Sequence, residues 1–220
     1  MKPLILINFK TYPEALGKNS LLLAKKLQQV QKKNKKFQIA VAPAALDIEE
    51  VTKNASLSVF AQHADPFAGG AHTGSISVNE LKLLGVQGTL LNHSEKKIPF
   101  AVLKETVALC KKFKIITVVC ASSLAEVRKV ALLHPNYLAY EPPELIGGDI
   151  SVTSAKPEII AKAVQAVQKI SPQTKVLCGA GVQSKEDVRK ALELGAQGVL
   201  VAHAVVRAEK PEKVLMEMMS

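Results

Sequence analysis

The stretch IITVVCASSLAEVRKVALLHPNYLAYE, residues 115–141, contains the pattern that decides the fold. It begins with a short apolar run at 115–120, continues with apolar residues at helical spacing over 123–133, and ends in a second apolar run at 137–140. Short runs rich in Val, Ile and Leu are typical of strands buried on both faces. The stretch therefore predicts two parallel strands joined by a helix.

The same alternation extends over the whole chain. Apolar runs predict strands at 3–9, 38–42, 57–61, 88–91, 115–120, 137–140, 175–178 and 198–201. Helical patterns lie at 20–33, 45–52, 77–84, 100–112, 123–133, 156–170, 184–194 and 211–218. Repeated strand–helix units imply a parallel sheet, either open and doubly wound or closed. No G-x-G-x-x-G motif follows the first strand, and eight units favour a closed α/β barrel, (β/α)8, with residues 1–220 as one domain.

The composition agrees with such a core and with a reducing compartment. Hydrophobic residues make up 48% of the chain but aromatic residues only 4%, so the core must consist mainly of aliphatic side chains. The three cysteines form no disulfide framework by their spacing. The N-terminal apolar run is too short for a signal peptide, and no segment is long enough for a membrane helix. We expect a cytoplasmic protein with no membrane partner.

The net charge of +10 suggests an anionic partner. Nucleic acid, a membrane surface or an anionic metabolite would each account for it. The lysines are scattered along the predicted helix faces, and few aromatic residues are available to stack on bases. A small anionic metabolite is therefore favoured over nucleic acid.

Chemically active residues fall at the ends of the predicted strands. The first strand ends at Asn8 and Lys10, the fourth at His93, the sixth at Glu141, and the seventh at the glycine-containing turn 179–181. In a (β/α)8 barrel the carboxyl ends of all strands meet on one rim, and active sites form there. These residues are thus expected to share one site.

The set fits proton transfer next to a carbonyl group. Glu141 is the candidate base, provided that a dry environment raises its pKa, and His93 can donate a hydrogen bond to the carbonyl oxygen. Lys10 supplies positive charge and Asn8 can orient a hydroxyl or carbonyl group. The turn 179–181 can offer backbone N–H groups to a phosphate.

The segment YEPPELIGG, residues 140–148, has rigid prolines at one end and permissive glycines at the other. Such a segment is suited to a loop that closes over the site and excludes water.

Other interpretations remain open at this point. His93 can also be a turn histidine, and the turn 179–181 can be structural. A barrel aldolase would use Lys10 as a Schiff-base lysine, and a basic nucleic-acid-binding domain would leave Glu141 without a role. The remaining histidines show no metal-ligand spacing, so we expect no metal.

Six segments carry a resemblance to a known family. They are N-F-K at 8–10, QHAD at 62–65 with HTG at 72–74, GTLLNHSE at 88–95, YEPPELIG at 140–147, AKPE at 155–158 and CGAGV at 178–182. Together and in this order, the chain resembles the triosephosphate isomerase family, particularly its shorter archaeal branch. The family is a standard example of a glutamate base paired with a neutral histidine.

The resemblance implies interconversion of dihydroxyacetone phosphate and D-glyceraldehyde 3-phosphate, a step of glycolysis and gluconeogenesis that needs no cofactor. It implies that Glu141 is the base, that His93 is the electrophile, and that Glu95 holds the charge of Lys10 in place. The substrate-binding residues would be Asn8, Lys10, Ile146, Gly147, Gly179, Gly181, Ala202 and His203. Residues 142–148 would form the lid.

The resemblance also implies a homo-oligomer, either a dimer or a tetramer, in which the loop 69–74 reaches a neighbouring subunit. Three positions depart from the family pattern: Gly148 in the lid, Lys96 where arginine is usual, and His203 in place of a small residue. None of these replaces the inferred base or electrophile.

Overall fold

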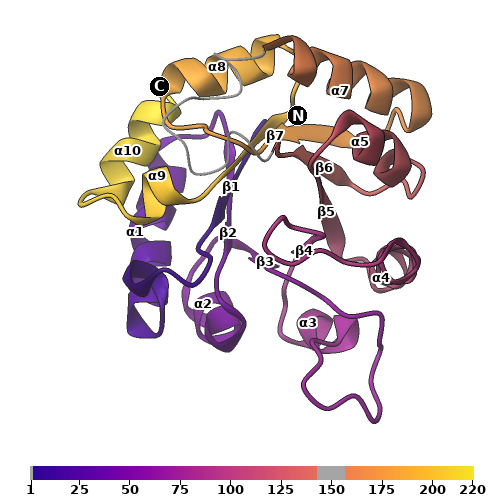
Figure 1. Ribbon diagram of the computed structural model, residues 1–220. Helices are drawn as coiled ribbons and strands as arrows, with labels where there is room; N and C mark the ends of the chain where they lie inside the picture. The colour runs from indigo at the N-terminus through magenta and orange to yellow at the C-terminus, as the bar shows by residue number, and fades with distance from the viewer. Residues whose placement is uncertain (1, 143–156) are drawn as a thin grey trace.

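The computed structural model describes residues 2–142 and 157–220 (Figure 1). Eight parallel strands of these residues pair in chain order, and the last pairs with the first to close a barrel. The strands are β1 (Leu4–Asn8), β2 (Gln38–Ala42), β3 (Ser58–Ala61), β4 (Gly88–Leu91), β5 (Ile116–Ala121), β6 (Tyr137–Tyr140), β7 (Lys175–Cys178) and β8 (Gly198–Val201). The predicted (β/α)8 barrel is confirmed.

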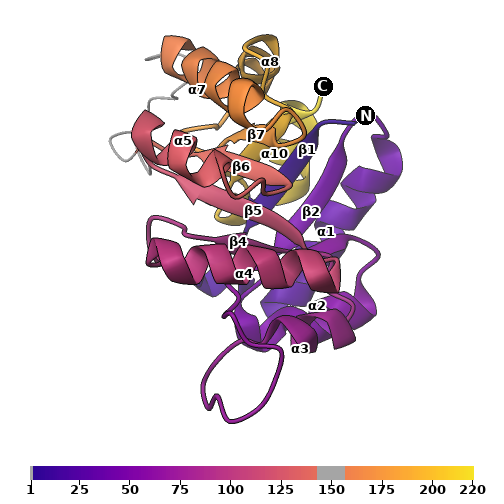
Figure 2. The ribbon, with the colours of Figure 1, turned by 90° about the vertical axis from the view of Figure 1, so that its right-hand side faces the viewer.

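Helices surround the strands on the outside of the barrel in both ribbon views (Figures 1 and 2). They are α1 (Lys18–Lys33), α2 (Ile48–Asn54), α3 (Val78–Leu83), α4 (Phe100–Phe113), α5 (Leu124–Ala131), α7 (Pro157–Ile170), α8 (Lys185–Glu193), α9 (His203–Val206) and α10 (Pro211–Met218), with 3-10 turns η1 (Pro13–Ala15) and η2 (Ala45–Asp47).

Each strand is apolar on both faces because one face fills the barrel and the other packs on helices. Leu4 and Leu6 of β1 belong to the inner cluster, whereas Ile5 and Ile7 pack with the helices. The inner cluster consists of Leu4, Leu6, Ala40, Ala42, Phe60, Leu90, Val118, Cys120, Ala139, Leu177 and Leu200. This two-sided burial explains why the runs in the sequence are continuously hydrophobic.

The alternation of side chains also places the polar residues. Successive side chains of a strand point to opposite faces, so the residue two positions beyond an inward residue continues inward. Asn8 follows Leu6 in this way, and Glu141 follows Ala139. The inward series of β1 and β6 therefore ends in polar groups at the carboxyl rim.

Most helix boundaries agree with the predictions to within two residues, because serine caps fix several of them. Ser123 caps α5 by accepting from the Glu126 N–H, and Ser184 and Asp187 form a capping box at α8. Two predictions differ. The pattern at 45–52 is divided between η2 and α2, and α9 was not predicted because a single helical turn is too short to show a period.

The segment between β3 and α3 extends away from the barrel in both ribbon views (Figures 1 and 2). Residues 68–74 of this segment are exposed to solvent. In residues 2–142 and 157–220, every helix is too short or too polar to cross a lipid bilayer.

Candidate active site

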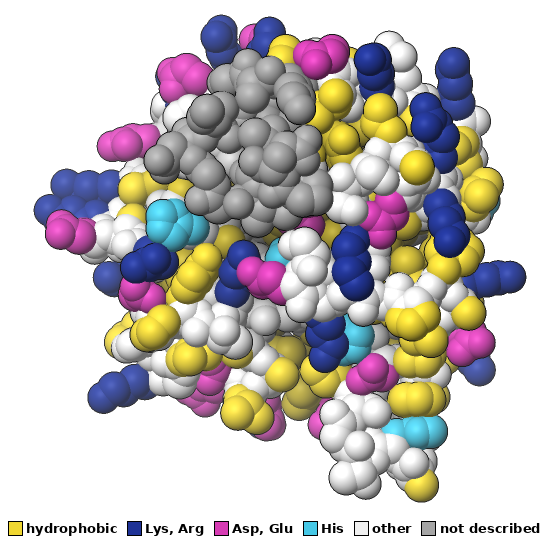
Figure 3. All heavy atoms as spheres, in the orientation of Figure 1, with side chains coloured by type: hydrophobic (Ala, Val, Ile, Leu, Met, Phe, Trp, Pro, Cys, Tyr) yellow, Lys and Arg dark blue, Asp and Glu magenta, His cyan; other side chains and the backbone are white. Residues whose placement is uncertain are grey.

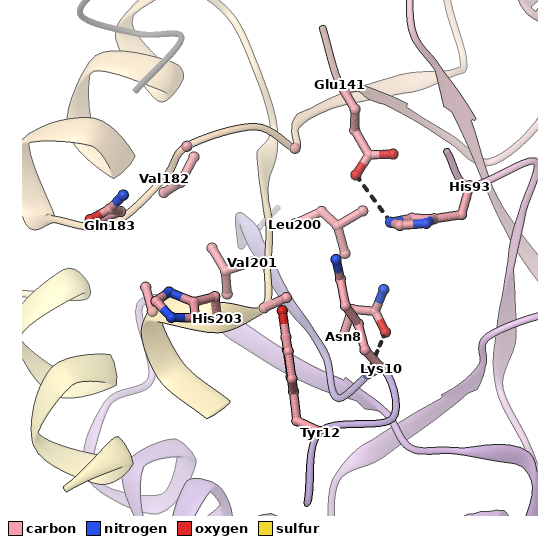
Figure 4. Close-up of a pocket in the computed structure, with 14 residues that line it drawn as sticks. Asn8, Lys10, Tyr12, His93, Glu141, Val182, Gln183, Leu200, Val201 and His203 are labelled. Atoms are coloured by element: carbon pink, nitrogen blue, oxygen red, sulfur yellow. Dashed lines mark hydrogen bonds and ion pairs between the residues drawn. The ribbon is translucent and has the colours of Figure 1, made fainter. Parts of the chain in front are cut away.

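A pocket opens at the carboxyl rim of the barrel, and Figure 4 shows its side chains. Strands β1, β4, β6, β7 and β8, or the turns that follow them, contribute to its wall. The lining residues are Asn8, Lys10, Tyr12, His93, Glu141, Gly179, Gly181, Val182, Gln183, Leu200, Val201, Ala202, His203 and Ala204.

The side chains of Glu141 and His93 point toward each other across this pocket (Figure 4). Glu141 Oε1 lies 3.6 Å from His93 Nε2. Only 4% of Glu141 and 8% of His93 is exposed. A carboxylate and an imidazole that share a buried pocket can serve as base and hydrogen-bond donor to one small molecule.

Burial changes the acidity of both groups. It raises the pKa of Glu141 to about 7, against the smaller opposing effects of a hydrogen bond with Cys120 and of the Lys10 charge. It lowers the pKa of His93, so the imidazole is neutral at physiological pH. Glu141 is therefore a stronger base than a glutamate in water, and its neighbour carries no competing charge.

Glycine is required at position 179 because Glu141 packs against the backbone there. A Cβ atom at Gly179 would lie 2.6 Å from Glu141 Cγ, which is closer than van der Waals contact allows. The Gly179 N–H donates to the Tyr140 carbonyl at 3.0 Å, so this close approach is part of the β6–β7 pairing. Any larger residue would displace the carboxylate.

The turn after β4 fixes the tautomer of His93. The Glu95 N–H donates to His93 Nδ1 at 3.2 Å, so Nδ1 is an acceptor and the neutral ring carries its proton on Nε2. Nε2 is the nitrogen that faces Glu141 and the pocket. The imidazole thus presents an N–H group to any ligand that enters.

Lys10 is held in place at both ends. Its Nζ lies 2.6 Å from Glu95 Oε1, and its backbone N–H donates to Asn8 Oδ1 at 2.9 Å. Its carbonyl accepts from Gln62 Nε2 at 2.9 Å. Lys10 adopts a φ of 49°, and these contacts hold it in that left-handed conformation.

Comparisons with known proteins agree with this arrangement. The family model described as Triosephosphate isomerase matches residues 3–219. The chain belongs to the triosephosphate isomerase family. It is 43% identical over 219 residues to the triosephosphate isomerase of Methanothermus fervidus, covering 100% of this chain and 98% of the relative. It is 42% identical over 215 residues to that of Methanocaldococcus jannaschii, covering 98% of each chain.

Every predicted site residue of this family member that lies in the described part of the chain is at or beside the pocket. Asn8, Lys10, His93, Glu141, Gly179, Gly181, Ala202 and His203 line it, and Glu95 contacts Lys10 and His93 from behind. Ile146, Gly147 and the predicted lid after Pro142 lie outside the described residues. The roles of all these residues in the isomerase reaction stay predictions.

Two residues near the site were not assigned a role from the sequence. Tyr12 lines the pocket, and the His203 ring meets it edge-on with centroids 6.5 Å apart. Gln62 donates to the carbonyls of Lys10 and Ala42 and so joins two strand ends. Tyr12 lies only two residues after Lys10 at the end of the first strand, and this position could have predicted that it lines the pocket. No local sequence pattern predicts that the Gln62 side chain contacts the carbonyls of Lys10 and Ala42.

No group of three or more His, Cys, Asp or Glu side chains within residues 2–142 and 157–220 is arranged to hold a metal ion.

Proposed function

We propose that Glu141 and His93 perform the reaction of the triosephosphate isomerase family in this chain, the interconversion of dihydroxyacetone phosphate and D-glyceraldehyde 3-phosphate. The observation that carries the proposal is the buried pair itself, with Glu141 Oε1 3.6 Å from His93 Nε2 in one pocket. Family membership supports the reaction, and the geometry supports the residues.

Glu141 acts as the base that removes a proton from the carbon next to the carbonyl and returns it to the neighbouring carbon. A base is most effective when its pKa is close to the working pH, and burial brings the pKa of Glu141 to about 7. Near neutral pH both the ionised form, which accepts a proton, and the protonated form, which returns it, are then accessible to Glu141.

His93 acts as a neutral electrophile. Its Nε2–H donates to the substrate oxygen on which negative charge grows as the enediolate forms. The isomerisation also moves the hydroxyl proton from one substrate oxygen to the other, and His93 Nε2 is the group placed to carry it. Glu95 supports this role by donating its backbone N–H to His93 Nδ1, and its carboxylate holds the ammonium group of Lys10. Lys10 and Asn8 bind the substrate, and the charge of Lys10 stabilises the enediolate.

The phosphate group binds at the opposite wall of the pocket. Backbone N–H groups of the turns at Gly181, Ala202 and His203 approach it, because Gly181 leaves the backbone bare and adopts a φ of 64° that suits such a turn. Gly179 binds the substrate only as bare backbone in the pocket wall, since its own N–H donates to the Tyr140 carbonyl. Residues 142–148 form a lid over the substrate, with Ile146 and Gly147 as its contacts to the ligand.

The basic surface favours capture of an anionic substrate. In Figure 3 the Lys and Arg side chains are spread around the visible face with acidic side chains between them, and they form no single stripe. A diffuse positive potential steers a phosphorylated triose toward the pocket. The same distribution gives no preference for nucleic acid, so we propose that no nucleic acid is bound.

We also propose a homo-oligomer, a dimer or a tetramer, in which the exposed loop 69–74 contacts a neighbouring subunit. This segment extends away from the barrel (Figure 2). The Phe67 and His72 rings stack with centroids 3.7 Å apart, which gives the segment internal order. A cytoplasmic location, with neither a membrane partner nor a cofactor, completes the proposal.

The function is tested by a coupled assay that follows dihydroxyacetone phosphate formed from D-glyceraldehyde 3-phosphate. We expect turnover without added metal or cofactor, and borohydride added with substrate should leave Lys10 unmodified because no Schiff base forms. A borohydride-trapped adduct on Lys10 together with carbon–carbon bond cleavage would instead indicate a barrel aldolase.

A further inference from the structure

The turn that carries His93 begins at a residue with a left-handed backbone conformation. Asn92 has a φ of 58°, a region that asparagine enters more readily than most residues because its short side chain can hydrogen-bond to nearby groups. Leu90 is the last side chain of β4 in the inner cluster of the barrel. The left-handed turn of the backbone at Asn92 breaks the strand alternation and directs the next side chain, that of His93, into the pocket. Whatever holds Asn92 in this conformation therefore determines where the imidazole lies.

The turn after β4 runs from Asn92 to Ile98, and the Asn92 side chain connects its two ends to each other and to strand β5. Its Nδ2 donates to the Cys120 carbonyl at the end of β5 at 2.9 Å, and its Oδ1 accepts from the Ile98 N–H at 3.1 Å. Asn92 is only 3% exposed, so these bonds are sheltered from water. His93, the proposed electrophile, and Glu95, which contacts Lys10, both lie between Asn92 and Ile98.

A carboxylate on the next helix then holds Asn92. Glu126 of α5 accepts from Asn92 Nδ2 at 2.7 Å through Oε1. Its Oε2 accepts from the backbone N–H and the hydroxyl of Ser122, both at 2.7 Å, and Lys97 Nζ lies 3.0 Å from each oxygen. Glu126 thus connects the turn after β4 to the turn after β5.

The charge state of Glu126 suits this role. Burial alone would raise its pKa, but the hydrogen bonds from Ser122, Asn92 and Lys97 outweigh this effect and lower the pKa to about 2. Above about pH 3 the carboxylate is therefore ionised and can accept from all of these donors at once.

We propose that Glu126 is a positioning residue for catalysis, because it holds Asn92 in the left-handed conformation that aims His93 at the substrate. The inference rests on the proposed role of His93. It adds that the orientation of His93 is held by a residue of the next strand–helix unit, β5–α5. Glu126 itself lies outside the pocket and touches no reacting atom.

The test compares Glu126→Gln with a matched variant, Glu80→Gln. Glutamine keeps the size of Glu126 but places an N–H donor where acceptors are needed. Glu80 occupies the same helix position behind a serine cap, since Ser77 Oγ accepts from the Glu80 N–H as Ser123 Oγ does from Glu126, and Glu80 is exposed. We expect Glu126→Gln to lower kcat roughly tenfold or more with little change in KM, and Glu80→Gln to leave both unchanged.

A double-mutant cycle with Asn92→Gly distinguishes positioning from general stability. Glycine adopts the left-handed conformation freely but cannot make the Asn92 bonds. If Glu126 acts through Asn92, Glu126→Gln should cost little further kcat in the Asn92→Gly background. If the Glu126→Gln variant does not fold, the Asn92→Gly variant tests the proposal by itself. We expect Asn92→Gly to fold and to lose kcat. An unchanged kcat in this variant would overturn the proposal.

A kcat for Glu126→Gln within twofold of the parent, or losses that multiply fully in the double variant, would also overturn it. These outcomes are separate from a failure of the proposed function. His93→Gln is made in the same series, and normal activity of that variant would refute the role of His93 itself, whatever Glu126 does.

Discussion

Replacement of Glu141 by aspartate should lower kcat by roughly a hundredfold or more while KM changes little. The side chain loses one methylene group, so the carboxylate withdraws from the substrate carbon by about 1 Å, and a displacement of this size is costly in a proton transfer. In the proposed arrangement, the phosphate and hydroxyl contacts that set KM are made by other residues. The measurement is steady-state kinetics in the coupled assay.

The matched control for this change is Glu105→Asp, which makes the same substitution at an exposed position of α4. It should keep normal kinetics and normal thermal stability. If Glu141→Asp also kept near-normal kcat, Glu141 would have no role as the base.

The ionisation of Glu141 can be followed separately in the free protein. Burial raises its pKa, so the carboxyl should lose its proton around pH 7 and the basic form should disappear as the pH falls below that value. A phosphate monoester also titrates near pH 6, and for this reason NMR of a 13C-labelled glutamate carboxyl is preferable to a pH–rate profile. A midpoint near 4.5, the ordinary value, would contradict the account.

Replacement of His93 by glutamine should also lower kcat strongly, by about a hundredfold. The amide can donate a hydrogen bond, but it reaches a different point and cannot be aligned by the Glu95 N–H through Nδ1. Because the loss occurs in the transition state, kcat and kcat/KM should fall together.

His134→Gln serves as the control for that variant. His134 is exposed and precedes β6, so it lies at the amino-terminal rim, away from the pocket. It should keep normal kcat. Equal small effects of the two substitutions would show that His93 is a structural histidine of its turn.

The fold was predictable because its signal is local and repeated. Apolar runs such as 38–42 and 198–201 mark strands that are buried on both faces, and the structure places β2 and β8 there. Serine caps at Ser123 and Ser184 fix helix starts in the same way. One helical turn, α9, gave no such signal because four residues span barely one period of about 3.6 residues and the pattern does not repeat.

The site was predictable only in part. The strand-end rule brought Asn8, Lys10, His93 and Glu141 to one rim, because all carboxyl ends of a parallel barrel meet there. The support behind them was not predictable. Glu126 looks like an ordinary helix-capping glutamate in the sequence, and its contact with Asn92 joins residues 34 positions apart. Such contacts depend on side-chain geometry that no local pattern encodes.

In the proposed reaction, Glu141 moves a proton between two carbons of a triose phosphate through an enediolate held by His93. It is tested most directly by converting dihydroxyacetone phosphate in D2O and analysing the D-glyceraldehyde 3-phosphate by NMR. We expect product with deuterium at C2, since a proton held on a carboxyl group exchanges with solvent before it is delivered to carbon. Absence of product, or product that carries at C2 only hydrogen transferred from C1, would contradict this role of Glu141.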